Sequence, residues 1–208
     1  GYFALTSQPI PLQRAQLYVA LFFLSGLTAV VGPLIYYSPA LYFLYYWFPP
    51  EMALGQVMAD YSLVDNAIRI SGMSVGALAV NAFLLARYGL TGVFDLAHPW
   101  RLALLLGAGF AGTYGGYRSA VLFQVLLVVV LFTVEGLWRT RHLLVALGVA
   151  LAVGGGLVIF VDKMPRAVQR AVSFLPIKVD PWVKMSAQSS TEWRLEMWRT
   201  LLPEVPNY

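Results

Sequence analysis

The sequence has no cysteine and few charged residues. The absence of cysteine from all 208 residues excludes disulfides, thiolate catalysis and cysteine metal sites. Charged residues make up 12% of the chain and hydrophobic residues 59%, whereas a soluble globular domain carries roughly 25% charged residues. The chain therefore lacks the polar surface with which a soluble protein of this length covers itself in water.

Patterns for metal and nucleic-acid binding are missing as well. The acidic residues are scattered, with no Asp-x-Asp, and the only histidines, His98 and His142, do not form a pair at helical spacing. We therefore expect no metal and no cofactor. The net charge of +4 comes from basic residues dispersed among hydrophobic segments, and this pattern does not favour nucleic-acid binding.

Long uncharged runs are the most informative feature that is present. A helix that spans a membrane needs roughly 20 mostly apolar residues, and lipid offers no partners to backbone N–H and C=O groups. The sequence therefore predicts an all-α protein whose residues 1–161 form a polytopic transmembrane helical bundle. About five membrane helices are expected, at residues 16–37, 66–86, 99–116, 117–136 and 142–161.

Two segments depart from this pattern. Residues 38–65 are rich in Tyr, Trp and Phe, which concentrate at headgroup level, so we predict an interfacial segment that either anchors the bundle or binds lipid. Residues 162–208 hold seven of the 14 Lys and Arg and five of the 10 acids, and are expected to begin a large loop outside the membrane.

Because the chain lacks an initiator Met and an obvious terminus, we expect a fragment, or the ordered part, of a longer protein.

The charge on the short loops predicts an orientation. We expect the side with the basic loops to face the cytoplasm of a bacterium, which places residues 162–208 in the periplasm and the protein in the cytoplasmic (inner) membrane. The 162–208 loop is itself basic, against the rule, but a loop of that length counts for less. The basic residues are Arg14, Arg87, Arg101, Arg139 and Arg141, and the acids of the opposite short loop are Glu51, Asp60 and Asp65.

Two arginines stand at the predicted outer ends of membrane helices, Arg69 in the first turn of the second helix and Arg118 at the start of the fourth. Arg118 follows Gly115 and Gly116, which allow a tight turn and a close backbone approach. An arginine in a membrane is costly, and a functional role is the first hypothesis. The alternative for both is a snorkelling anchor; the glycine turn favours function for Arg118.

A second group of candidate residues lies in the outer loop, in Ser-Ser-Thr-Glu-Trp-Arg-Leu-Glu-Met-Trp-Arg at 189–199. Ser189 and Glu192 fit a capping box that begins a helix. On that helix Arg194 and Trp198 are four residues apart and share a face, so we expect Arg194 to point inward with Trp198 stacked beside it. The alternative is an ordinary amphipathic surface helix.

Two arginines that meet in one outer cavity suit a phosphate ligand. Guanidinium groups bind phosphate oxygens bidentately and stay charged at any physiological pH. Such a pair could hold a lipid-linked pyrophosphate and stabilise the charge that develops on it as a leaving group.

At these residues the sequence resembles the O-antigen ligase and O-antigen polymerase family. The resemblance covers about residues 65–208 and rests on the Gly-Gly-Tyr-Arg-Ser turn, one further helix, and an outer loop with Trp-Arg-x-x-x-Trp. It implies a GT-C-like membrane glycosyltransferase that moves a glycan from undecaprenyl pyrophosphate to a hydroxyl of a glycan or lipid acceptor at the periplasmic face. It implies that this reaction requires neither a nucleotide sugar nor a metal ion.

The resemblance also implies roles for single residues. Arg118 matches the family's membrane-helix arginine and Arg194 its loop arginine, both of which hold the pyrophosphate. The family's base, a histidine further along the outer loop, has no counterpart here, because both histidines fall on the predicted cytoplasmic side. The residues that we expect to line the donor site are Arg69, Tyr117, Ser119, Trp198 and Arg199.

Two other functions fit the sequence. The main competitor is a transporter or flippase for a lipid-linked or anionic solute, which would tend to show internal repeats and helices broken at mid-membrane. We find no repeat, and both candidate arginines lie at an outer boundary. A purely structural membrane subunit is the third possibility.

Overall fold

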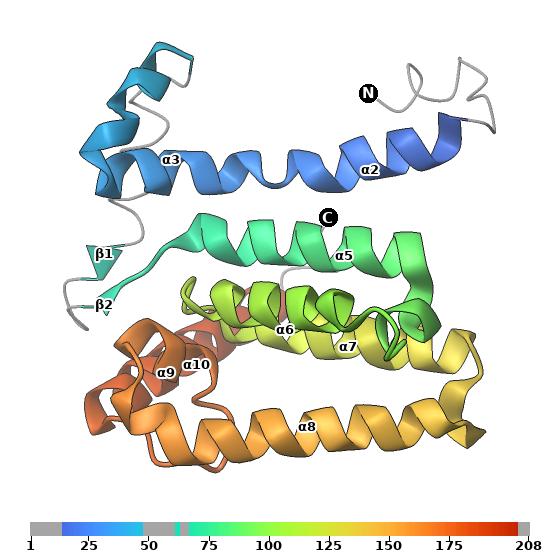
Figure 1. Cartoon of the computed structure of the whole chain (residues 1–208). Coiled ribbons are helices and arrows are strands. Elements are labelled where there is room, and N and C mark those ends of the chain that lie inside the picture. Colours follow the sequence, from blue (N-terminus) through green and yellow to red (C-terminus); the bar gives the residue numbers. More distant parts are fainter. Residues whose placement is uncertain (1–13, 48–60, 63–66, 204–208) are drawn as a thin grey trace.

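The computed structural model describes residues 14–47, 61–62 and 67–203, and this part of the chain is almost entirely helical (Figure 1). The interfacial segment predicted at 38–65 lies mostly outside these residues. A short antiparallel pair, β1 (Tyr61–Ser62) with β2 (Ala67–Ile68), precedes the main bundle. The helices are α2 (Ala15–Ser25), α3 (Thr28–Tyr37), η2 (Pro39–Tyr46), α5 (Ser71–Val93), α6 (Pro99–Thr113), α7 (Arg118–Val134), η3 (Leu137–Arg139), α8 (Arg141–Phe160), η4 (Val161–Lys163), α9 (Arg166–Ala171) and α10 (Pro181–Leu201).

Three helical segments are long and apolar enough to cross a membrane: Ala15–Tyr36, Gly72–Val93 and Arg141–Lys163. The other two predicted spans are shorter. α6 has 15 residues and α7 has 17, which at 1.5 Å per residue gives roughly 23 and 26 Å, less than the roughly 30 Å of a bilayer's hydrocarbon core. The structure thus gives a helical protein with three candidate spans, fewer than the five predicted.

The first span is interrupted at Gly26–Leu27, between α2 and α3. Pro33 lies inside α3. A helical proline removes the N–H donor for the carbonyl four residues earlier, which here belongs to Ala29. That carbonyl lies so close to Gly72 of α5 that a Cβ on Gly72 would be 1.9 Å from its oxygen. The freed carbonyl therefore faces the glycine of the neighbouring helix.

α5 runs past the predicted end at residue 86. The predicted helix ended before Arg87 because the uncharged run ends there. In the structure the Arg87 side chain is exposed and donates a hydrogen bond to the Gln16 side chain. The helix is kinked further on, at Gly89 (φ 63°). There the carboxylate of Glu135 accepts hydrogen bonds from the backbone N–H groups of Leu90 (2.8 Å) and Thr91 (3.2 Å). A residue from the end of α7 thus fixes the last turn of α5.

The main apolar core lies where α5, α6 and α7 meet, and it includes Leu85, Val93, Leu105 and Phe132. α8 packs on this core with few contacts, and none of its residues is buried. We call the end with the α5–α6 and α7–α8 connections the Arg141 end, and the end with the α6–α7 turn, α9 and the start of α10 the Arg118 end (Figure 1).

Candidate functional site

The α6–α7 turn positions Arg118 through close contacts with the start of α5. The N–H of Ile70 donates to the carbonyl of Tyr114 (3.2 Å), and the Ser74 hydroxyl donates to the carbonyl of Gly112 (2.8 Å). A Cβ on Gly115 would lie 1.9 Å from the Ser74 oxygen. The glycine that the sequence analysis tied to close approach is therefore required by the packing of α5 against this turn.

Gly116, the second glycine, has φ +69° and touches Arg69. A Cβ at Gly116 would be 3.3 Å from Cδ of Arg69. The aliphatic part of the half-buried Arg69 side chain therefore lies along the turn that leads into Arg118. Arg69 and Arg118 therefore lie at the same end of the bundle.

Arg118 connects α7 to α10. Its side chain is half-buried, and Nη2 donates to the carbonyl oxygen of Ala187 (2.8 Å) and to Oγ1 of Thr191 (2.9 Å). The Thr191 hydroxyl in turn donates to the same Ala187 carbonyl (3.0 Å). These bonds hold the loop helix at the end of the membrane helix where sequence reasoning expected the two to meet.

α9 supplies an arginine that the sequence analysis did not single out. Arg170 donates to the hydroxyl of Ser186, the residue next to Ala187. Arg166, one turn earlier, pairs with Asp180 (3.5 Å). The i, i+4 spacing of Arg166 and Arg170 was the available signal, but the sequence did not show that this six-residue helix packs against α10.

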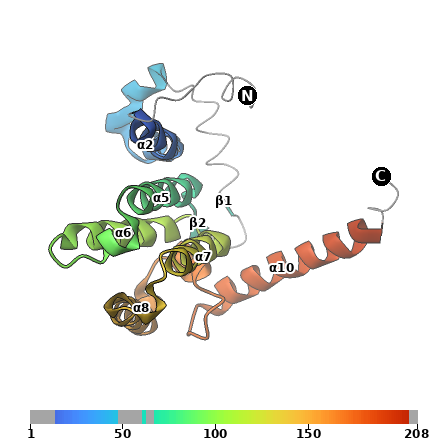
Figure 2. The same ribbon diagram turned by 90° about the vertical axis from the view of Figure 1, so that its right-hand side faces the viewer.

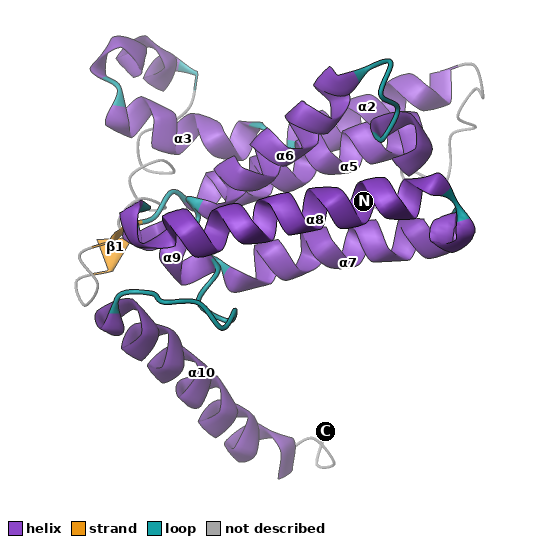
Figure 3. Cartoon of the chain, turned by 60° about the horizontal axis from the view of Figure 1, so that its bottom comes forward, coloured by secondary structure: helices purple, strands orange, loops and turns teal. Residues whose placement is uncertain are grey.

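Arg194 lies on α10 three residues after Thr191, and its charge acts repulsively on that of Arg118. The two guanidinium groups are therefore close enough to interact, as expected for one site. Its side chain is exposed, because the second half of α10 leads away from the bundle (Figures 2 and 3). The expected inward direction of Arg194 stays a prediction.

The other predicted site residues do not gather around Arg118 to the same degree. Tyr117 and Ser119 flank it and are exposed. Trp198 is 54% exposed on the projecting half of α10. The predicted stacking of Trp198 on Arg194 is not observed. Among the described residues, arginine–ring contacts are formed by Arg101, with Tyr88 and Trp100. Arg199 is also exposed and lies 3.9 Å from Glu196 on the same helix.

The predicted start of the loop helix is wrong as well. α10 begins at Pro181, eight residues before the Ser189 of the proposed capping box. Asp180 caps it by accepting a hydrogen bond from the Trp182 N–H (3.0 Å), and proline is favoured at the first helical position. Ser189 lies inside the helix, where its hydroxyl donates to the Ser186 carbonyl.

Both histidines lie at the Arg141 end, far along the bundle from Arg118. His98 pairs with Asp95 (2.9 Å), and His142 contacts the Thr140 hydroxyl (3.2 Å). Within the described ranges the structure contains no cluster of three or more His, Cys, Asp or Glu side chains that could hold a metal ion.

Two of the positive-φ glycines, Gly116 and Gly136, give a matched test of the turn. Alanine at either position should cost about 1–2 kcal/mol in backbone strain, because both have left-handed φ values (69° and 66°). Only at Gly116 does the new methyl group also meet Arg69, since nothing lies within 4 Å of a Cβ on Gly136. We expect similar losses of thermal stability in detergent from both variants, but impaired ligand binding at the Arg118 end only from Gly116→Ala. Equal effects on binding would show that the Arg69 contact does not matter.

Comparisons with protein-family models, curated proteins and solved structures find no significant match to this chain.

Proposed function

We propose that the protein binds a lipid-linked pyrophosphate at the Arg118 end and transfers its glycan to a hydroxyl acceptor, as in O-antigen ligases and polymerases. In this proposal it is an enzyme of the bacterial inner membrane, with the Arg118 end facing the periplasm, and α6 and α7 cross the membrane together with the three longer spans. The observation that carries the proposal is the half-buried Arg118, which is hydrogen-bonded to α10 at Ala187 and Thr191, one turn before Arg194, whose like charge acts on it.

Two neighbouring guanidinium groups repel each other, and a bound anion removes that repulsion. A pyrophosphate offers oxygens to both groups, and hydrogen bonds between ionised groups are about twice as strong as neutral ones. Transfer of the glycan leaves additional negative charge on the pyrophosphate, which fixed guanidinium groups stabilise without rearrangement. Arg118 and Arg194 are therefore assigned to the leaving group.

Two further arginines support an anionic ligand at this end. Arg69 lies along the turn before Arg118, and Arg170 contacts the α10 residue next to the one that Arg118 binds. Asp180 is occupied elsewhere, by Arg166 and as the cap of α10. The groups around Arg118 are thus mainly cationic, as a donor with two phosphates requires.

A transporter or flippase for a lipid-linked or anionic solute is the second candidate, and one observation favours it. Asn81, in the middle of α5, is 4% exposed, and its Oδ1 has no hydrogen-bond partner in the described structure. The amides of Gln124 on α7 and of Asn81 both lie next to Gly109 of α6, 3.2 and 3.7 Å from a Cβ built on that glycine. Polar groups at mid-depth are typical of a transport pathway.

A binding measurement tests the proposed function directly. Undecaprenyl pyrophosphate should bind the full-length protein in detergent, and Arg194→Ala should weaken binding about tenfold or more, because a hydrogen bond to a charged group contributes about 1.5–3 kcal/mol. Lys184→Ala is the control, since it removes an exposed cation from the same helix. Unchanged affinity in Arg194→Ala would contradict the donor site. Loss of binding in Asn81→Leu instead would favour transport.

A further inference from the structure

We propose a second ligand site, at the opposite end of the bundle: a groove between α6, α7 and α8 that binds one anionic phospholipid. Its phosphate lies at Arg141 and His142, and one acyl chain lies along the groove. Its polar part lies at the end opposite Arg118, its groove runs from there toward the Arg118 end, and the site does not depend on the proposed transfer reaction.

The apolar part of this site is a groove of about 640 Å³. Its walls are mainly aliphatic, with the amides of Asn81 and Gln124 among its lining side chains. Along α8 it extends from Ala146 to Phe160, 14 residues apart, which corresponds to roughly 21 Å at 1.5 Å per residue. One leaflet of a bilayer has roughly 15 Å of hydrocarbon, half of the roughly 30 Å core. The groove is therefore long enough for a whole acyl chain.

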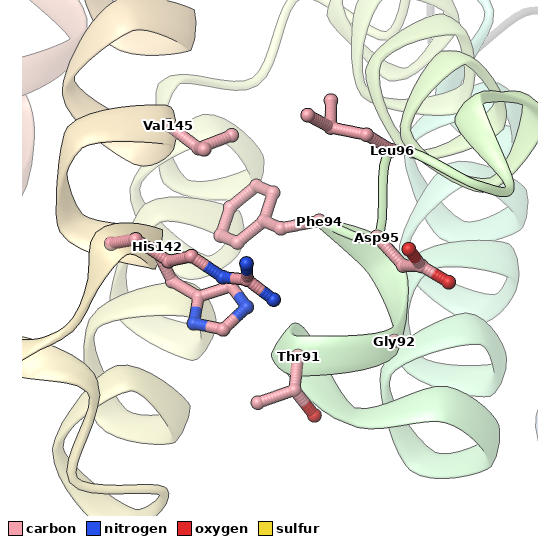
Figure 4. A pocket seen from close by; sticks show the side chains of 8 residues that line it. Thr91, Gly92, Phe94, Asp95, Leu96, His142 and Val145 are labelled. Atoms are coloured by element: carbon pink, nitrogen blue, oxygen red, sulfur yellow. The ribbon is translucent and has the colours of Figure 1, made fainter.

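The polar part is a pocket of about 530 Å³ at the Arg141 end. It adjoins the groove, because Phe94 lines both and Val145 of the pocket is next to Ala146 of the groove. Figure 4 shows His142, from the start of α8, facing Phe94 and Thr91 across the pocket. The side chains of Arg141, His142 and Thr91 bring a guanidinium, an imidazole and a hydroxyl to one cavity.

One acidic residue lines the pocket, but its carboxylate is already engaged. Oδ1 of Asp95 accepts from the N–H of Ala97 (3.0 Å), and Oδ2 bonds to His98 (2.9 Å). The hydrogen bond with His98 and then that with Ala97 lower the pKa of Asp95. In Figure 4 its carboxylate is turned away from His142. It therefore leaves the Arg141 side of the cavity to an anion.

Charge and shape together identify the occupant. A guanidinium binds phosphate oxygens, and the polar pocket continues directly into an apolar groove of acyl-chain length. A soluble phosphate compound would leave the groove empty, and a lipid without phosphate would leave the guanidinium without an anion. In a zwitterionic phospholipid the ammonium of the headgroup offsets the charge of the phosphate and is repelled by Arg141. An anionic phospholipid such as phosphatidylglycerol fills both parts.

The test uses full-length protein in nanodiscs with a photoactivatable phosphatidylglycerol that carries a diazirine on its acyl chain. Cross-links should map by mass spectrometry to groove residues such as Leu106 and Val149, several times more often than with the phosphatidylcholine analogue. The double variant Arg141→Ala with His142→Ala should reduce phosphatidylglycerol labelling at least about tenfold, since it removes charge-assisted hydrogen bonds. Arg139→Ala, an exposed arginine outside the pocket lining, should leave it unchanged.

A second variant separates loss of the site from loss of folding. Val149→Trp should fill the groove and abolish labelling there while the thermal melting temperature stays near the wild-type value. Equal labelling by the two lipids, or full labelling of the double variant, would overturn the proposal. Cross-links from a photoreactive residue at Val149 into another polypeptide would also overturn it, because a protein helix would then occupy the groove.

Discussion

Arg118→Ala is expected to reduce glycan transfer by the full-length protein about tenfold or more while leaving membrane insertion intact. The substitution removes a cation from the proposed pyrophosphate site, where a charged hydrogen bond contributes about 1.5–3 kcal/mol. It also removes both hydrogen bonds to α10, at Ala187 and Thr191. Lysine should restore activity only in part, because an ammonium keeps the charge and lacks the two-pronged geometry of the guanidinium. Transfer is measured on membranes with equal amounts of protein.

Thr191→Val separates the two consequences of losing Arg118. Valine removes the hydroxyl that accepts from Nη2 of Arg118 but leaves the guanidinium and the bond to the Ala187 carbonyl. We expect a loss of less than tenfold. If Thr191→Val is as damaging as Arg118→Ala, then Arg118 acts by holding α10. If Arg118→Ala transfers glycan at the wild-type rate, the donor-site assignment is wrong.

The second large effect is expected from Gly72→Val, which should strongly destabilise the packing of α3 against α5. A Cβ at Gly72 would lie 1.9 Å from the carbonyl oxygen and 2.7 Å from the carbonyl carbon of Ala29, both backbone atoms that cannot rotate away. Overpacking typically costs about 1–3 kcal/mol and occasionally more; this case belongs at the upper end. The readout is the melting temperature in detergent, together with the yield of folded protein.

Gly107→Val is the matched control, since it places the same side chain on another helix where nothing lies within 4 Å of the added Cβ. Its cost should be well below that of Gly72→Val. Equal destabilisation by the two variants would mean that the α3–α5 contact is not as close as the structure indicates.

The helices were predictable where charge and proline mark their limits. The uncharged runs placed α6 at its observed start, Pro99, and α8 within one residue at either end. α5 was misjudged because the charge of Arg87 was taken as its end, whereas Glu135, from the end of α7, holds a further turn through the N–H groups of Leu90 and Thr91. A helix end that is set by contacts with residues distant in the sequence cannot be recognised from the neighbouring residues alone.

The candidate site was predictable where local sequence features mark it, and not where it depends on distant residues. The two glycines before Arg118 indicated a close approach, and the structure accounts for both, one through Ser74 and one through a positive φ. The start of α10 was missed because the capping box at Ser189 was preferred to Asp180–Pro181, a shorter but better-formed start signal. Arg170 was missed because its partner, Ser186, comes from a later element whose position only the fold determines.

The sparse packing of α8 has a consequence for how the protein is made. This helix has no buried residues, so as a candidate span it would enter the membrane on its own hydrophobicity, and its 23-residue apolar segment is long enough to do so. α6 has the opposite character, because it is short and carries Arg101, which is bonded to the carbonyl of Gly92 and lies over Tyr88. If α6 crosses the membrane, as proposed above, it should be retained there during synthesis through α5, whereas α8 should insert independently. The two helices therefore differ in how they would enter the membrane: α8 through its own hydrophobicity, and α6 through its packing on α5, an earlier helix.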